Sequence, residues 1–417
     1  MRITKANQPI TICVVGAGHR ADQYLEAMQK FYQGKFHVTS IFEPSPVRQA
    51  YFKDKYQVDT IYAGGYEDFL KIDERLTDIV IIGTNDDMHY LPAKHALLKG
   101  YDILLEKPIC QRLEEVLELK DLQKDDQFVA VCHVLRHSPF FVKIKEIIDS
   151  GVIGKVVNIQ HNENIGFFHF AHSYVRGNWR NNEVAAPLIV AKSCHDLDIL
   201  LHLTGKHCKR ISSFGSLSFF NHEHYDEKTM SKRCTVCPRE PDCPFSAVKI
   251  YGLGIFEWMP FDTQNRDNLY RQLNASPYGR CVFASDNDVV DHQVTIIEFD
   301  DGLTATFNLS AFTSRVTRTL KIMGEYGEIR ADTDVKDIEV KVWAKDTEKV
   351  RVETKLIGGH DGADEGMIIN LMEAYLHGRP FESTLKDSIE SHVMAFKAEE
   401  SRINDGKVQE IAPLMAK

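Results

Sequence analysis

The sequence lacks the long apolar runs and the basic excess that membrane-bound and nucleic-acid-binding proteins carry. No apolar run approaches the roughly 20 residues that a membrane-spanning helix needs. The 50 lysines and arginines are outnumbered by 60 aspartates and glutamates, which gives a formal net charge of −10. Because such a chain repels phosphates and anionic lipids, we expect no nucleic-acid partner and no membrane partner.

The chain also lacks internal repeats, low-complexity tracts and a signal-peptide pattern at residues 1–5. We therefore expect a cytoplasmic protein, whose 9 cysteines are reduced, catalytic or metal-bound rather than paired in disulfides. A length of 417 residues exceeds what one hydrophobic core usually supports, which predicts two domains.

A glycine-rich turn stands between a β-branched run (residues 9–15) and a helical pattern that begins near residue 19. In a strand–turn–helix unit of this kind, Gly16 permits the tight turn, Gly18 lets the backbone approach a pyrophosphate, and Ala21 keeps helix and strand close. The helix N-terminus adds a partial positive charge. We predict a dinucleotide site here, with His19 and Arg20 among its residues.

An acidic residue, Glu43, ends the next expected strand (residues 36–42), about 20 residues beyond the turn. A carboxylate at this place accepts hydrogen bonds from ribose hydroxyls and repels a ribose phosphate, and no arginine follows at once. The pattern therefore favours NAD over NADP as the cofactor. The alternative is a solvated carboxylate in a turn.

Strands then alternate with helices up to residue 132, which predicts an α/β fold with a doubly wound parallel (Rossmann) sheet. Ligands of such sheets bind at the carboxyl ends of the strands. The candidate cofactor-binding residues at that edge are Thr84, Asn85, His89, Glu106 and Lys107.

The pattern changes after Pro139 to strands in hairpin-like succession, joined by short turns such as residues 300–302. We expect a C-terminal α+β domain with a mostly antiparallel sheet. The predicted division is a dinucleotide-binding domain at 1–137 and a substrate-binding and oligomerisation domain at 138–417, with a Cys-rich insert of little periodicity at 221–280.

Two stretches carry candidate catalytic residues. Lys107, in Glu106-Lys107-Pro108, follows a strand, where a lysine can relay a proton, and Pro108 restricts its backbone. In the second stretch, helical spacing puts Lys192 and His195 on one face, and imidazole has a suitable pKa to accept a hydroxyl proton. Asp196 or Asp198 could orient His195. The alternatives are a surface lysine and a structural histidine.

Further polar residues are candidates for substrate binding. An aromatic stretch at 167–180 contains His172, Arg176 and Trp179, which suit stacking on and hydrogen bonding to a sugar. Its paired histidines are weak evidence for a metal, because no acidic or cysteine partner stands nearby. His292 and His360 lie in polar clusters that could line the pocket or form surface turns.

The insert contains Cys234, Cys237 and Cys243 in a Cys-x2-Cys-x5-Cys arrangement, with Cys281 as a fourth candidate thiolate. Closed zinc sites take four nitrogen or sulfur ligands and can fold a segment that has no core of its own. We expect either a structural zinc at these four residues or reduced cysteines packed in a loop.

The glycine turn, the 84–89 segment, the Glu-Lys-Pro triplet and the His-Asp-x-Asp helix together resemble the glucose–fructose oxidoreductase / inositol dehydrogenase (Gfo/Idh/MocA) family over essentially the whole chain. The resemblance implies NAD(P)-dependent chemistry on a sugar, cyclitol or related hydroxyl compound, with Lys107 and His195 flanking the reacting carbon. Two positions depart from it. Asn85 replaces a usual proline, and Ala191 stands where many members carry aspartate, so we expect Lys192, next to it, to take over polar contact with the substrate.

The sequence therefore predicts an oxidoreductase that transfers a hydride between NAD and a secondary hydroxyl of a sugar, cyclitol or sugar derivative. Two alternatives remain open: an NAD-dependent redox glycosidase that acts by transient oxidation and elimination, and a non-catalytic sugar-sensing regulator, against which the presence of Lys107 and His195 argues. By the same resemblance, we expect a homodimer or homotetramer.

Overall fold

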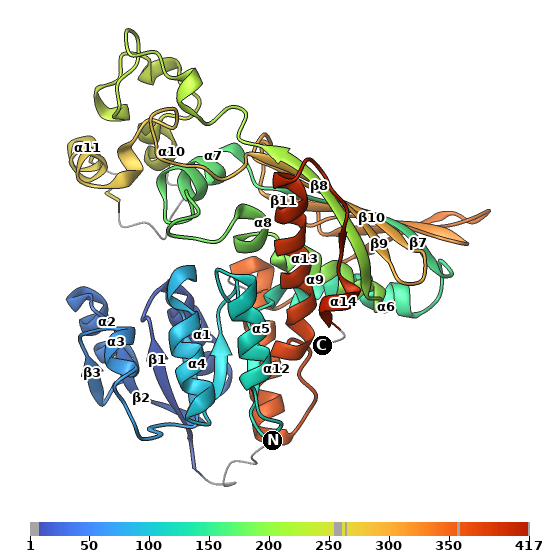
Figure 1. Cartoon of the computed structure of the whole chain (residues 1–417), viewed down its shortest axis with the longest axis horizontal. Helices are drawn as coiled ribbons and strands as arrows, with labels where there is room; N and C mark the ends of the chain where they lie inside the picture. Colours follow the sequence, from blue (N-terminus) through green and yellow to red (C-terminus); the bar gives the residue numbers. More distant parts are fainter. Residues whose placement is uncertain (1–7, 254–260, 263–264, 357–358, 416–417) are drawn as a thin grey trace.

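Two sheets, each covered by helices, make up the protein (Figure 1). The structure is a computed structural model that describes residues 8–253, 261–262, 265–356 and 359–415. Within these ranges, no helix has the length and apolar character needed to cross a membrane.

The first sheet has six parallel strands and lies at the lower left of Figure 1. Its order is β3 (Thr60–Tyr62), β2 (Phe36–Phe42), β1 (Ile10–Val15), β4 (Ile79–Ile82), β5 (Asp102–Leu105), β6 (Val129–Val131). Successive strands are added toward one edge of the sheet from β1 to β3 and toward the other edge from β4 to β6, so the strand order reverses between β1 and β4. A crevice at the carboxyl ends of these strands is where such sheets bind ligands.

Helices cover both faces of this sheet, and the β-branched strands between them are almost wholly buried, as expected of a parallel sheet. The helices and short turns of this part are α1 (His19–Phe31), α2 (Pro46–Tyr56), α3 (Tyr66–Phe69), η1 (Asp86–Met88), α4 (Tyr90–Leu98), α5 (Leu113–Leu122) and η2 (Val134–His137).

The second sheet has nine strands and is antiparallel except for the parallel pair β7 and β10. Its order is β14 (Thr347–Arg351), β13 (Asp337–Val342), β12 (Gly327–Asp332), β11 (Thr317–Gly324), β7 (Val156–Asn164), β10 (Thr304–Ser310), β9 (His292–Phe299), β8 (Cys208–Ser216), β15 (Gln409–Glu410). The predicted fold class, a Rossmann sheet followed by a mostly antiparallel α+β domain, is confirmed.

One face of this sheet is covered by helices, and the long helix α13 lies between the two sheets (Figure 1). The helices after residue 138 are α6 (Pro139–Asp149), α7 (Phe167–Phe170), α8 (Leu188–Ala191), α9 (Cys194–Thr204), α10 (Ala247–Gly252), α11 (Arg266–Ala275), α12 (Ala363–His377), α13 (Leu385–Ile403) and α14 (Ala412–Met415). A π-helical turn, η3 (Ala171–Arg176), continues α7, and a short turn, η8 (Gly359–Gly362), precedes α12.

The chain returns to the first sheet after eight of the nine strands of the second sheet, since β15 follows later. Helix α12 packs against α1, and its buried residues, among them Met367 and Leu371, share one apolar cluster with β1 and α1. Tyr375 also donates a hydrogen bond to Asp102 of β5, at 2.8 Å. The first sheet is therefore covered partly by a segment from the far end of the sequence.

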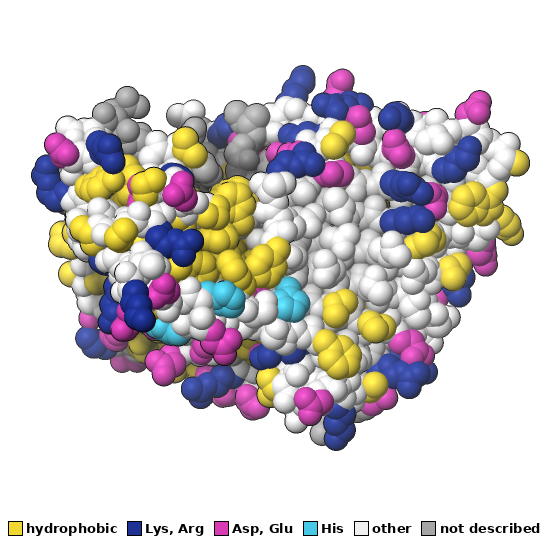
Figure 2. Space-filling model, turned by 90° about the horizontal axis from the view of Figure 1, so that it is seen from above, with side chains coloured by type: hydrophobic (Ala, Val, Ile, Leu, Met, Phe, Trp, Pro, Cys, Tyr) yellow, Lys and Arg dark blue, Asp and Glu magenta, His cyan; other side chains and the backbone are white. Residues whose placement is uncertain are grey.

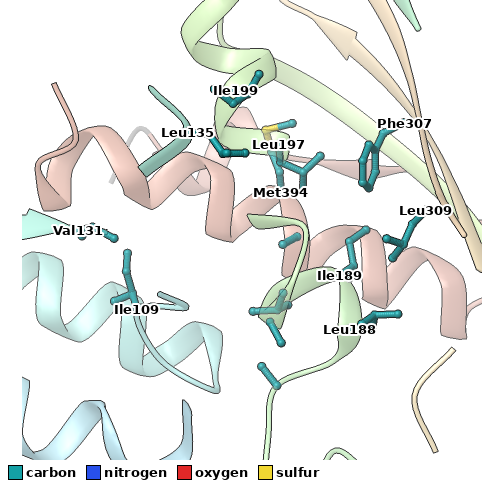
Figure 3. Packing of buried hydrophobic residues seen from close by; sticks show 14 of the residues in the cluster. Ile109, Val131, Leu135, Leu188, Ile189, Leu197, Ile199, Phe307, Leu309 and Met394 are labelled. Atoms are coloured by element: carbon teal, nitrogen blue, oxygen red, sulfur yellow. The ribbon is translucent and has the colours of Figure 1, made fainter. Parts of the chain in front are cut away.

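A second apolar cluster joins the two sheets into one core. Helix α13 begins with a capping box between Thr384 and Asp387. In Figure 3 its Met394 lies between Val131 of the first sheet and Phe307 of the second. The two domains are thus held by packed side chains rather than by a bare linker.

Two local expectations are corrected. The helix expected around Lys192 and His195 is broken into α8 and α9, with Lys192 and Ser193 between them. The insert at 221–280, expected to show little regular structure, contains α10 and α11 together with several short turns.

Candidate functional site

The glycine turn between β1 and α1 has the geometry that a pyrophosphate needs. Gly16 has φ +86°, and a Cβ there would approach the Thr84 backbone nitrogen to 2.8 Å, so no other residue fits. A Cβ on Gly18 would meet protein atoms only at 3.7 Å or more. Since no side chain caps α1, its first N–H groups remain for a phosphate, and this turn fits a dinucleotide.

Glu43 is buried at the end of β2 and faces the same turn. Its carboxylate accepts hydrogen bonds from the backbone N–H groups of Ala17, at 3.0 Å, and Ser45, at 2.9 Å. The guanidinium of Arg48, which is mostly exposed, lies 3.9 Å from this carboxylate. The ribose end of the site thus holds a fixed carboxylate and, beside it, a cation that the sequence pattern had not signalled.

The segment after β4 closes the carboxyl edge of the sheet. The ring nitrogens of His89 lie 2.7 Å from the Pro108 carbonyl oxygen and 3.1 Å from that of Thr84, so His89 ties two loops together. Asn85 is exposed. The Thr84 hydroxyl is buried without a hydrogen-bond partner.

Arg20 and Glu106 belong to a buried ion-pair group beside the nucleotide turn. Arg20 contacts Glu106 at 2.8 Å and, through α12, Asp364 at 2.6 Å, while Tyr24 also donates to Glu106. Burial would raise the pKa of the Glu106 carboxyl, but Arg20 and Lys107 together hold it below its usual value. His19, next to Arg20, is exposed.

Lys107 reaches from the first domain to the helices of the second. Its ammonium group donates a hydrogen bond to the Ala191 carbonyl oxygen at 2.9 Å, and its backbone N–H donates to the Glu106 carboxylate. The Lys107–Pro108 peptide bond is cis. Ala191 lies four residues before His195, so the lysine is held at the start of the segment that carries the histidine.

His195 lies in the first turn of α9 and is 4% exposed. Burial and then the nearby Lys107 ammonium lower the pKa of His195 well below its usual range, so the imidazole is neutral near pH 7. Its Nδ1 is buried without a hydrogen-bond partner. A neutral imidazole in this position can accept a proton.

Neither aspartate of the His-Asp-x-Asp segment contacts His195. Asp198 forms two hydrogen bonds with the guanidinium of Arg136, at 2.6 and 2.7 Å. Asp196 binds His161, at 2.7 Å, and Arg318, also at 2.7 Å. Burial raises the pKa of each carboxyl, but Arg318 with the His161 hydrogen bond at Asp196, and Arg136 at Asp198, outweigh it and hold both pKa values below the usual range.

Lys192 completes a charged network on the covered face of the second sheet. Its ammonium group lies 3.1 Å from Glu163 of β7, and the other oxygen of Glu163 lies 2.7 Å from Arg318 of β11. Lys192, Arg318, His169 and His360 line a cavity of about 420 Å³. The ring centres of His360 and His195 lie 6.1 Å apart, so one lining residue of this cavity neighbours His195, which does not itself line it.

Comparison with known proteins identifies the family to which this architecture belongs. A family profile described as "Oxidoreductase family, NAD-binding Rossmann fold" matches residues 10–133, and one described as "Oxidoreductase family, C-terminal alpha/beta domain" matches residues 145–409. The chain belongs to the Gfo/Idh/MocA family. The resemblance inferred from its motifs is thereby confirmed.

Individual relatives of the family are distant. A protein named YteT from Bacillus subtilis (strain 168) is 22% identical over 338 residues, which is 77% of this chain and 76% of that protein. An inositol 2-dehydrogenase of Corynebacterium glutamicum (strain R) is 23% identical over 208 residues, or 48% and 55% of the two chains. The structure of levoglucosan dehydrogenase in complex with NADH and levoglucosan covers 97% of this chain and 99% of its own, with a TM-score of 0.70 and 15% identity.

The membership makes this chain an oxidoreductase with an NAD-binding Rossmann domain. Homologues act on sugars and inositol, at low identity. The nucleotide turn described above is the part of the structure that agrees most directly with this conclusion.

Of the residues expected to bind substrate, Lys192 lines the cavity described above and Trp179 lies near the sheet edge, whereas the other three lie elsewhere. The Trp179 indole donates to Asp86 at 3.1 Å. His172 contacts the Tyr251 hydroxyl under the insert, and Arg176 donates to the carbonyl oxygens of residues 245 and 280. His292 pairs with Asp291 and is not among the residues that line the cavity beside His195.

The four cysteines of the insert do come together, around a separate cavity of about 380 Å³ that phenylalanines also line. However, across the described ranges no group of three or more His, Cys, Asp or Glu side chains is arranged to hold a metal ion. Burial raises the pKa of the Cys281 thiol to about 11. The structure does not support the expected zinc site and agrees with thiols packed in a loop.

Sequence reasoning missed three contributors to the site. Asp86 is buried between Trp179 and Lys107, and burial raises the pKa of its carboxyl. Arg318 comes from a strand in which nothing distinguishes it, and Asp364 comes from α12. Asp86 could have been noticed two residues after Thr84, whereas the other two depend on contacts between distant segments.

Proposed function

We propose that this protein transfers a hydride between NAD and a secondary hydroxyl of a sugar, cyclitol or sugar derivative. The observation that carries the proposal is the hydrogen bond from Lys107 to the Ala191 carbonyl oxygen, because it holds the lysine of the first domain next to the His195 segment of the second. Both groups then face the carboxyl edge of the sheet that carries the nucleotide turn.

In this proposal, His195 is the base and Lys107 assists it. Bound NAD supplies the hydride acceptor. The neutral His195 imidazole takes the hydroxyl proton, and the Lys107 ammonium stabilises the negative charge that develops on the substrate oxygen. In the reverse direction the protonated imidazole returns the proton to a carbonyl oxygen, so the same two groups serve both directions.

Glu43 supports NAD as the preferred cofactor. Its carboxylate is fixed by the backbone of the turn, and a buried carboxylate there repels the additional phosphate of NADP. Arg48 works against this preference, since its guanidinium lies only 3.9 Å from the carboxylate. We give the larger weight to Glu43 because it is buried and held by two hydrogen bonds, whereas Arg48 is exposed.

The cavity beside His195 supports a polyhydroxylated substrate. Its lining combines charged and imidazole groups with the apolar Phe140 and Phe141, the mixture that hydroxyl-rich rings require. The names of the relatives, an inositol dehydrogenase and a levoglucosan dehydrogenase, agree with this class.

A panel of sugars, cyclitols and glycosides tests the proposal. NADH formation at 340 nm and release of aglycone are followed together in the wild-type protein and in His195→Ala. We expect NADH formation from at least one free sugar or cyclitol, and its loss in the variant. Aglycone release without net NADH would favour the glycosidase alternative. NAD binding without turnover of any compound would favour the regulator.

We also infer a homodimer or homotetramer formed by the uncovered face of the second sheet. Figure 2 shows this broad surface, which carries few charged side chains away from its rim. Val157, Ile296 and Phe214 are about half exposed on it. Light scattering coupled to size-exclusion chromatography tests the assembly, and Ile296→Asp should shift it toward the monomer.

A further inference from the structure

A second histidine, His133, lies next to His195 and has no hydrogen-bond partner. It follows β6 at the carboxyl edge of the first sheet and is 0% exposed. Neither of its ring nitrogens has a hydrogen-bond partner. A buried polar group without a partner costs free energy, so such a residue calls for an explanation.

His392, Asp198 and His195 all lie near His133, and the first two are already engaged, Asp198 by Arg136. The ring centre of His392 lies 5.3 Å away, but its Nε2 accepts the Ile109 N–H and its Nδ1 lies 2.8 Å from the Ser388 carbonyl oxygen. Asp198 lies 3.8 Å from Nδ1 of His133. The remaining neighbour is His195, whose ring centre lies 5.6 Å away at an interplanar angle of 78°.

His195 also has a ring nitrogen without a hydrogen-bond partner. Its Nδ1 is buried without a partner, and both aspartates that follow it are bound elsewhere. Each imidazole nitrogen lies about one ring radius from its ring centre, so modest rotation of the two rings brings a nitrogen of each into hydrogen-bond distance. Nε2 of His133 is the nitrogen left for this contact, because Nδ1 faces Asp198.

We propose that His133 is a positioning residue that accepts a hydrogen bond from Nδ1–H of His195 and thereby fixes the tautomer in which Nε2 of His195 can take a substrate proton. The inference rests on the proposed function. It supplies the orienting partner that a histidine base generally needs and that neither Asp196 nor Asp198 provides.

The proton balance is simple. When a hydroxyl is oxidised, the hydride leaves its carbon for the cofactor and the hydroxyl proton goes to Nε2 of His195. The positive charge then spreads over the two hydrogen-bonded imidazoles. Asp198, held ionised by Arg136, stabilises this charge from behind.

The charged groups that face His133 act in opposite directions. Asp198 and Glu106 favour a positive charge on its ring, whereas Lys107 and Arg136 oppose it. Burial comes first among the causes that lower the pKa of His133 to about 4. The resting ring is therefore neutral near pH 7 and can accept the hydrogen bond.

The test reads the tautomer of His195 directly, in addition to turnover. Protein with ¹⁵N-labelled histidine is compared as wild type, His133→Phe and His133→Gln by long-range ¹H–¹⁵N spectra at pH 7.5. We expect a single Nδ1–H tautomer of His195 in the wild type, a mixture in His133→Phe, and recovery in His133→Gln, whose amide oxygen accepts the same hydrogen bond. With the substrate found by the panel, kcat should fall roughly 10- to 100-fold in His133→Phe and recover partly in His133→Gln.

A matched control comes from the same short turn. His137→Asn changes a histidine of η2 that contacts Ser383 rather than His195 and should leave the tautomer and kcat unchanged. NAD binding by every variant shows that it has folded. An unchanged His195 tautomer in His133→Phe would overturn the inference. A fixed tautomer together with failure of the whole substrate panel would instead overturn the proposed function.

Discussion

Two groups of buried polar side chains lie within the same core and differ in how completely they are paired. On the second sheet, Arg318 lies 2.7 Å from both Glu163 and Asp196, and His161 lies 2.7 Å from Asp196, so each of these carboxylates has a cation beside it, although Glu163 accepts no hydrogen bond. At the edge of the first sheet, His133 and His195 have buried nitrogens without partners. The paired network keeps the sheet and α9 together, whereas the unpaired nitrogens of His133 and His195 are available for the hydrogen bond proposed between them and for a proton.

The largest effect on turnover should come from substituting His195, whose Nδ1 is unpaired, or Lys107 beside it. Lys107→Met and His195→Ala should each lower turnover roughly 10²- to 10⁴-fold, because a positioned acid–base group contributes on that scale. The double variant should lose far less than the product of the two, since both serve one step. Steady-state kinetics measure this, with Lys94→Met, a partly exposed lysine of α4 paired with Glu118, as the control. If the loss of turnover in the double variant equalled the product of the two single losses, the two residues would act in different steps.

Substitutions in the paired network of the second sheet should instead change the free energy of unfolding. Arg318→Met leaves Asp196 and Glu163 as buried carboxylates without their guanidinium, which should lower the free energy of unfolding by about 3–5 kcal/mol. Urea denaturation measures the change. Arg330→Met, an exposed arginine of β12 paired with Glu328, should cost less than about 1 kcal/mol. Equal losses of unfolding free energy in Arg318→Met and Arg330→Met would mean that burial of the network does not add to its contribution to stability.

The pH dependence of stability should separate the two groups. The folded pKa of His133 lies near 4, below the value of about 6.5 for an unfolded histidine. The unfolded chain therefore binds the proton first, and stability falls as the pH drops from about 6.5 to 4, by roughly 3 kcal/mol for this residue. His133→Phe should flatten this part of the profile.

The carboxylates of the paired network contribute in a lower range. The pKa values of Asp196 and Asp198 lie below the unfolded value, so their stabilisation is present above about pH 4 and is lost only as the pH falls further. Urea midpoints measured from pH 8 to pH 3 resolve the two ranges. An identical slope of wild type and His133→Phe between pH 6.5 and 4 would contradict the first of them.

The smallest effect concerns the ribose end of the nucleotide turn, where Glu43 is well held and Arg48 is exposed. Glu43→Ser should reduce the preference for NAD over NADP by about tenfold, the equivalent of roughly 1.4 kcal/mol. Arg48→Ala, the matched variant, should weaken NADP binding and leave NAD binding nearly unchanged. Fluorescence titration with both cofactors measures this, and equal wild-type affinities would remove the role given to Glu43.

Much of the fold was predictable because its signals are local. The expected strand at 9–15, the helix beginning near residue 19 and the strand at 36–42 agree with β1, α1 and β2 to within one residue, and the hairpin-like strands after Pro139 agree with the second sheet. The short strands β3 and β14 were missed, since three to five residues carry little periodicity. The break between α8 and α9 was missed because the sequence there remains helical in pattern.

The candidate site was less accessible to sequence reasoning. Lys107 and His195 could be named because each follows a recognisable motif. The contacts of His172 and Arg176 under the insert could not be foreseen, since they depend on how a poorly patterned segment folds back. His133 and Asp364 gave no signal at all, because only the three-dimensional arrangement places them beside His195 and Arg20.

The return of α12 to the first sheet has a consequence for synthesis on the ribosome. The nucleotide-binding domain begins at the N-terminus, yet its apolar surface beside α1 stays bare until α12 has been translated. Contacts between such distant segments form late and slowly. The nascent first domain therefore stays incompletely covered while strands β7 to β14 of the second sheet are made. This interval is when aggregation or a bound chaperone would decide the yield of folded protein.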